Sequence, residues 1–165
     1  MNLNGNIFAE ANKEITDDIK EQLRLQGHFL TGALEKSIKE IVIETPNGFE
    51  LTASAAEYME DLESGVPGEH ISIYPKSIQE MTRYVELRMG YSGKYAQKVA
   101  VAILKKQQKE GMPTKGSYQY SKTGERTEAI KDTFHQNQDK YGQVIDNKVS
   151  GILDADFNTI QSQTF

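Results

Sequence analysis

Residues 41–53 read IVIETPNGFELTA, two strand-like runs on either side of a turn. All three residues of 41–43 are β-branched, and residues 46–48 are the turn formers Pro, Asn and Gly. After the turn, apolar side chains alternate with polar ones, as in a strand with one buried face. The apolar members are Phe49, Leu51 and Ala53. We expect an antiparallel hairpin here, and the alternation at Ile71 and Ile73 predicts a short third strand of the same sheet.

Helical spacing precedes the hairpin. Apolar residues recur every three or four positions across residues 7–26, which predicts an amphipathic helix that Gly27 ends. These residues are Phe8, Ala11, Ile15, Ile19 and Leu23. Thr31 is then placed to cap a short helical turn in which Leu34 and Ile38 share one face.

Three shorter helices are predicted after the hairpin. The first is brief and carries its apolar residues at Ala55, Met59 and Leu62. The second begins at the capping-box pair Ser77 and Glu80 and stops near Gly90. The third runs from about residue 92 to 109.

A long C-terminal helical region follows, with Gly142 and Gly151 as its weak points. Its apolar residues are Ile130, Phe134, Tyr141, Ile145, Val149, Ile152 and Ile160. We expect residues 154–165 to be a flexible tail. Together the elements predict an α+β fold in one domain over residues 1–165, with a small antiparallel β-sheet packed against several helices.

The composition removes several kinds of chemistry. The chain has 165 residues, a mean hydropathy of −0.61 and no cysteine, which excludes disulfides, thiolate catalysis and Cys-bound zinc. The histidines are too far apart in sequence for a local ligand pair, and no G-x-S-x-G motif occurs. Neither a membrane-length apolar run nor a signal-peptide start is present. We expect a soluble, non-enzymatic protein made in a cytoplasm, with no catalytic residue, metal, cofactor or membrane contact.

Charge is distributed unevenly along the chain, whose net charge is −5. Residues 1–93 hold 8 Lys or Arg against 16 Asp or Glu, residues 94–131 hold 9 against 3, and residues 132–165 hold 2 against 5. This pattern fits acidic and basic faces that meet between copies, a basic strip near nucleic acid, or charges scattered over solvated faces.

A basic group with tyrosines is the first candidate for function. It spans the end of the predicted helix 92–109 and the long segment 111–124, which we expect to project as an interaction loop. Its members are Lys105, Lys106, Lys109, Lys115, Tyr118, Tyr120, Lys122 and Arg126. The cations can pair with carboxylates or phosphates, and the tyrosines can stack or add interface area. The group fits a protein interface, a position near nucleic acid, or an idle solvated loop.

An acidic group is the second candidate, formed by Glu57, Glu60, Asp61 and Glu63. Carboxylates at this spacing can act as an acid–base pair or bind a hard cation. An exposed helix face that meets a partner is the simpler interpretation, because no apolar pocket is evident to shift a pKa. A phosphate-binding loop at 111–117 is not supported, since Ser117 stands where the loop lysine would be.

The order of motifs from about Phe29 to Lys131 resembles the tail-completion, or neck, proteins of tailed bacteriophages. After a leading helix come LTGALEKSI (30–38) and AAEYMEDLESG (55–65), where the family has a tyrosine, an acidic residue and a glycine at similar spacing. Then YVELRMG (84–90) precedes AQKVAVAILKKQQKEGMPTKG (96–116), which is similar to the family's helix and glycine-threonine-proline loop. The N-terminal helix and the region after Asp132 resemble the family less.

The resemblance implies a structural virion protein without catalytic activity. Copies would form a homo-oligomeric ring, six- or twelvefold, around the DNA passage between portal and tail. Its partners would be a portal or adaptor protein and tail proteins, with non-specific contact to genomic DNA, and its place would be the neck of the virion. The alternative function is a small DNA-binding module that uses the basic segment 94–131.

Overall fold

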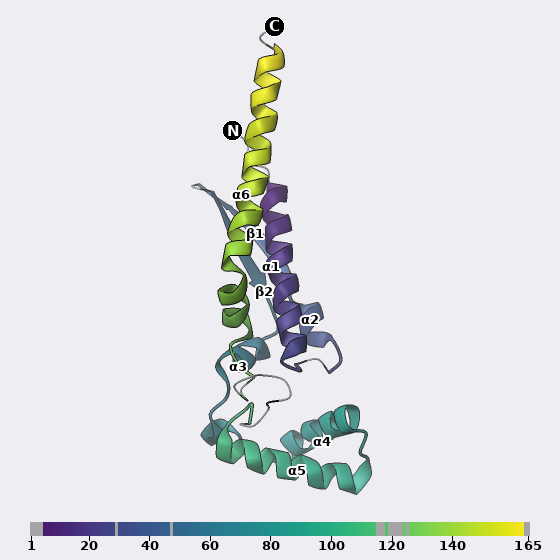
Figure 1. Cartoon of the computed structure of the whole chain (residues 1–165). Coiled ribbons are helices and arrows are strands. Elements are labelled where there is room, and N and C mark those ends of the chain that lie inside the picture. Colours follow the sequence, from purple (N-terminus) through teal and green to yellow (C-terminus); the bar gives the residue numbers. More distant parts are fainter. Residues whose placement is uncertain are drawn as a thin grey trace.

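The computed structural model describes residues 5–28, 30–46, 48–114, 118, 124 and 126–163. Its elements in chain order are α1 (Gly5–Leu25), α2 (Ala33–Ser37), β1 (Lys39–Thr45), β2 (Gly48–Ser54), α3 (Tyr58–Ser64), the 3-10 helix η1 (Gly68–His70), α4 (Pro75–Met89), α5 (Gly93–Glu110) and α6 (Ala129–Gln163). The predicted α+β class is confirmed: a small antiparallel sheet packs with helices, and the chain ends in a long helix (Figure 1).

An antiparallel pair formed by α1 and α6 makes the long axis of the molecule (Figure 1). The apolar period predicted for α1 is confirmed, because its members Ala11, Ile15, Ile19 and Leu23 are all buried. On α6, Tyr141 is buried and its hydroxyl donates to Asp18 at 2.9 Å. Lysines flank this contact, since Lys140 pairs with Asp18 and Glu14, and Lys148 pairs with Glu10. The main core joins these two helices to α2 and α3, since Leu34, Ile38 and Met59 are buried in the same cluster.

The hairpin β1–β2 packs against α1 in the predicted position. Lys39 pairs with Ser54 at the open end and Thr45 with Gly48 at the turn. The Asn12 amide donates to the carbonyl oxygens of Ile41 and Thr52, at 3.0 and 2.8 Å. These polar bonds fix the hairpin to α1 one helical turn from Phe8, whose ring stacks on Phe49 with the centroids 4.6 Å apart.

A second, smaller core joins α4 to α5. Val85, Ala96 and Ala100 are fully buried there, and the small alanines allow the two helices to approach closely. The α4–α5 pair lies at the end of the molecule opposite the C-terminal end of α6 (Figure 1). The 3-10 helix η1 contacts the far end of α5, where a Cβ at Gly68 would overlap the carbonyl oxygen of Gln108.

The predicted third strand is wrong. Among the described residues the sheet has two strands, and the segment with Ile71 and Ile73 lies beside α5 instead. The Gln108 amide donates to the Ile71 carbonyl at 3.1 Å, so a side chain takes the place of a neighbouring strand.

One helix boundary also differs from the prediction, while the long C-terminal helix is present and continuous. Helix α4 begins at Pro75, two residues before Ser77, and the Ser77 hydroxyl accepts a hydrogen bond from the Tyr74 backbone nitrogen at 3.0 Å. Ser77 is therefore the third helical residue and not the cap. Helix α6 runs unbroken through Gly142 and Gly151, and residues 154–163 continue it as helix.

Candidate interaction surfaces

The acidic group of α3 divides into two parts. Glu57, Glu60 and Asp61 are exposed, and none of them forms an ion pair with a residue that the structure describes. Glu63 is half-buried, and its carboxylate accepts hydrogen bonds from the backbone nitrogens of Ile130 and Lys131, at 2.9 and 3.0 Å. Glu63 thus caps the first turn of α6, which gives it a structural role in the monomer.

The basic group is only partly within the described residues. Lys115, Tyr120 and Lys122 lie outside them. Tyr118 is 70% exposed, and its ring covers Gly124 so closely that a Cβ there would lie 3.0 Å from it. The interaction loop predicted over residues 111–124 is therefore described only at its ends and at these two positions.

The lysines of α5 form a more regular surface than the sequence analysis recognised. Lys105 and Lys109 share one face with Lys94 and Lys98, which that analysis did not select. Their spacing of four, seven and four residues is the signal that could have found them, because it returns to the same side of a helix. We call Lys94, Lys98, Lys105 and Lys109 the lysine row. Lys106 lies off this face and is 3.8 Å from Glu110.

Arg126 belongs to a polar junction inside the monomer. Its guanidinium donates to the carbonyl oxygen of Gln26, and the Gln26 amide donates to the carbonyl oxygen of Thr127 at 3.1 Å. His28 lies 2.8 Å from the Arg126 carbonyl oxygen through Nε2. Burial is the main cause that lowers the pKa of His28, and the Arg126 charge adds to it. The junction joins the end of α1 to the segment that leads into α6, so Arg126 works as a structural residue.

A cavity of about 310 Å³ adjoins this junction and is lined in part by His28, Tyr58, Tyr84, Arg88 and Arg126. It lies where the α1–α2 turn, α3 and α4 meet. Both arginines already interact within the chain, so the cavity wall is an internal contact between elements.

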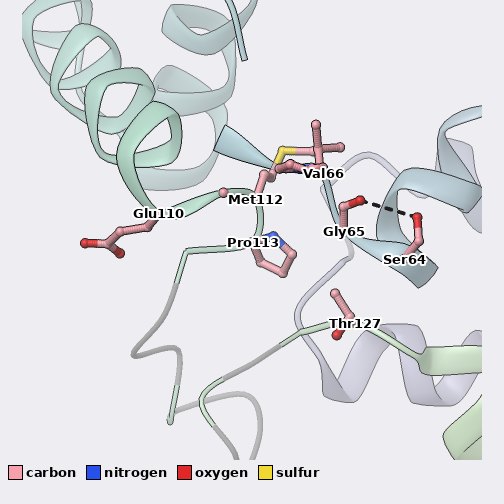
Figure 2. A pocket seen from close by; sticks show the side chains of 9 residues that line it. Ser64, Gly65, Val66, Glu110, Met112, Pro113 and Thr127 are labelled. Carbon is pink, nitrogen blue, oxygen red and sulfur yellow. Dashed lines mark hydrogen bonds between the residues drawn. The ribbon is translucent and has the colours of Figure 1, made fainter. Parts of the chain in front are cut away.

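A second cavity, of about 290 Å³, lies where the chain returns from α5 (Figure 2). Val66 and Met112 exchange two backbone hydrogen bonds there, of 2.7 and 2.8 Å. Gly111 has φ 90°, and a Cβ on it would lie 3.0 Å from the Val66 carbonyl oxygen. Figure 2 shows Glu110 pointing away from these residues, while the Ser64 hydroxyl is bonded to neighbouring backbone. The site is a tight crossing of two segments that do not bring acid, base and nucleophile together.

Large apolar side chains are exposed at both ends of the molecule. On the last turns of α6 these are Leu153, Phe157 and Ile160, which we call the distal α6 stripe. At the turn between α4 and α5 they are Leu87, Met89, Tyr91 and Tyr95, which we call the α4–α5 tip. Every one of the seven is between 42% and 64% exposed. The sequence prediction counted Ile160 among the regularly spaced apolar residues of the C-terminal helix. It did not distinguish the exposed apolar residues at the two ends of the molecule from those of the core.

Neither a membrane-spanning helix nor a metal-binding group of side chains is present among the described residues. No described helix has the length and apolar character needed to span a membrane. In the same part of the chain, no three Asp, Glu or His side chains are grouped so as to hold a metal ion.

The chain was compared with family models, with curated proteins and with solved structures, and none of them matches it.

Proposed function

We propose that this chain is a structural subunit that assembles with further copies into a ring, as the head-to-tail connector of a tailed bacteriophage. One observation carries the proposal: the distal α6 stripe and the α4–α5 tip expose apolar side chains at opposite ends of an elongated molecule. Clustered exposed apolar residues mark surfaces that are covered by a partner. Two different surfaces at separate places suit contacts between unlike faces, which close into rings when the rotation allows it.

The distribution of charge supports the same assembly. Residues 75–110, which contain α4 and α5, hold eight Lys or Arg against three Asp or Glu. Residues 5–69 hold five against fourteen. The basic side chains of α4 can therefore meet an acidic part of the neighbouring copy, which favours one relative orientation over others, while the lysines of α5 stay exposed.

The place in the virion rests on the ordered motifs from LTGALEKSI to the glycine-threonine-proline segment. In this proposal the ring lines the DNA passage between portal and tail, and contacts a portal or adaptor protein on one side and tail proteins on the other. The protein is made in the cytoplasm of the bacterial host. Its work is mechanical, and the acidic group of α3 serves as contact surface and helix cap without a catalytic role.

Mass photometry and negative-stain microscopy of the purified chain over a concentration series test the proposal. We expect a discrete symmetric ring, alone or with portal or tail components. Replacing Leu153, Phe157 and Ile160 by Gln should return the chain to monomers, because the surface that drives association becomes polar.

The control is Asn147→Ala with Asn158→Ala, which changes exposed positions of the same helix at about 120° around its axis from the distal α6 stripe. This variant should assemble like the parent chain. A chain that stays monomeric at every concentration and binds no portal or tail component would refute the connector role.

A further inference from the structure

The lysine row is a straight line of positive charge on α5. With 3.6 residues per turn, its four members fall within an arc of about 60° and extend over about 22 Å of helix. This arc lies opposite the side of α5 that carries the buried Ala96 and Ala100. The row therefore faces away from α4 and into solvent.

The row has no carboxylate partner, a property that it shares with Lys36 and Lys39 but not with the other seven lysines that the structure describes. All four members are exposed, and none forms an ion pair with any residue in the described ranges. By contrast, Lys13, Lys76, Lys106 and Lys131 each lie within 4.0 Å of an Asp or Glu three or four residues away. Four like charges on one helix face repel one another, so this arrangement is unfavourable in the isolated chain.

The chemistry of the row fits a phosphate backbone better than a protein surface. Lysine is depleted in protein–protein interfaces, where a long side chain must be ordered and its ammonium dehydrated. Against duplex DNA the ammonium groups stay hydrated at the surface and release condensed counterions. Carboxylates of neighbouring elements do not neutralise the row within the described residues, because none of them, including Glu80 and Glu86 of α4, lies within 4.0 Å of a row ammonium.

We propose that the lysine row is a contact surface for the phosphate backbone of duplex DNA, without sequence preference. The inference does not depend on ring assembly, because one copy of the chain already carries the whole row. In a ring, the same weak contact would be repeated by every copy and strengthened by multivalency.

Fluorescence anisotropy with a labelled random-sequence DNA duplex tests the inference on the full chain. Each neutralised phosphate changes the slope of log K against log salt concentration by about −0.9, so four contacts give a slope of about −3.6. Affinity should then fall by about 150-fold between 50 and 200 mM salt, by that same slope. Replacing all four row lysines by Gln should abolish binding, and single replacements should each reduce the slope by about 0.9.

The control variant replaces Lys13, Lys76, Lys106 and Lys131 by Gln. It also removes four positive charges, but from lysines that already have acidic partners. Binding retained in the control and lost in the row variant, with both folded by circular dichroism, supports the inference. Equal loss in both variants, no binding of the parent chain at low salt, or tighter binding of the row to polyglutamate than to DNA overturns it.

Discussion

At His28, one protonation state satisfies both ring nitrogens. The Arg126 carbonyl oxygen can only accept, so Nε2, which lies 2.8 Å from it, carries the proton. The Arg126 guanidinium can only donate, so Nδ1, 3.4 Å away, is unprotonated. The imidazole is therefore neutral, in agreement with a pKa that burial holds below its ordinary value of 6.5.

This assignment predicts a pH-dependent contribution to stability. A depressed folded-state pKa gives stability that is complete above 6.5 and is lost as the pH falls through the folded value, because the unfolded chain binds the proton more readily. His28→Gln keeps a donor for the Arg126 carbonyl but cannot titrate. The stability advantage of the parent chain over this variant, measured by urea unfolding, should be smaller at about pH 5.5 than at about pH 7.5.

The comparison variant is His70→Gln, since the His70 side chain is 68% exposed. The free energy of unfolding of this variant should lie within about 0.5 kcal/mol of that of the parent chain, because the replaced side chain is exposed. An advantage over His28→Gln that stays constant with pH would show that the ring does not titrate differently in the folded chain.

The start of α6 depends on a carboxylate from another element. Glu63 accepts the backbone nitrogens of Ile130 and Lys131, and its negative charge lies at the positive end of the helix dipole. Glu63→Ala should therefore lower the free energy of unfolding by about 1 to 2 kcal/mol. Glu60→Ala, at an exposed position of the same α3, should change it by less than about 0.5 kcal/mol. Urea denaturation checks both values, and equal effects would contradict a capping role.

Elements could be predicted where their signal is local. The apolar period of α1 and the alternation of the hairpin come from neighbouring residues, and both elements were found within two residues of the expected bounds. The third strand could not be predicted correctly, because Ile71 meets Gln108, 37 residues away, in place of a strand. The cap at Glu63 is also hidden from sequence, since its partners lie 67 and 68 residues later.

At the scale of the molecule, the candidate surfaces could be predicted from the sequence only in part. Composition identified the basic segment, but Arg126 is used inside the monomer while Lys94 and Lys98 complete an exposed row. A helical apolar period normally indicates a buried face, and it continues through α6 to Ile160. Whether such a face is buried depends on the length of the partner helix, which the period does not encode.

Helix α6 is longer than its partner α1, and this difference in length predicts that α6 has two parts with different functions. Helix α1 has 21 residues and α6 has 35, and the last ion pair between them joins Glu10 to Lys148. Every described side chain from Leu153 to Gln161 is exposed. Deleting residues 153–165 should therefore change the free energy of unfolding of the monomer by less than about 0.5 kcal/mol, while the ring is lost.

Deleting residues 140–165 is the matched longer truncation. It removes the buried Tyr141 and both lysines that pair with α1, so it should cost about 3 kcal/mol or more. Urea unfolding and mass photometry of the two truncated chains separate stability from assembly. If the shorter deletion already unfolds the chain, the distal α6 stripe packs within the monomer; if rings persist without it, the copies meet through another surface.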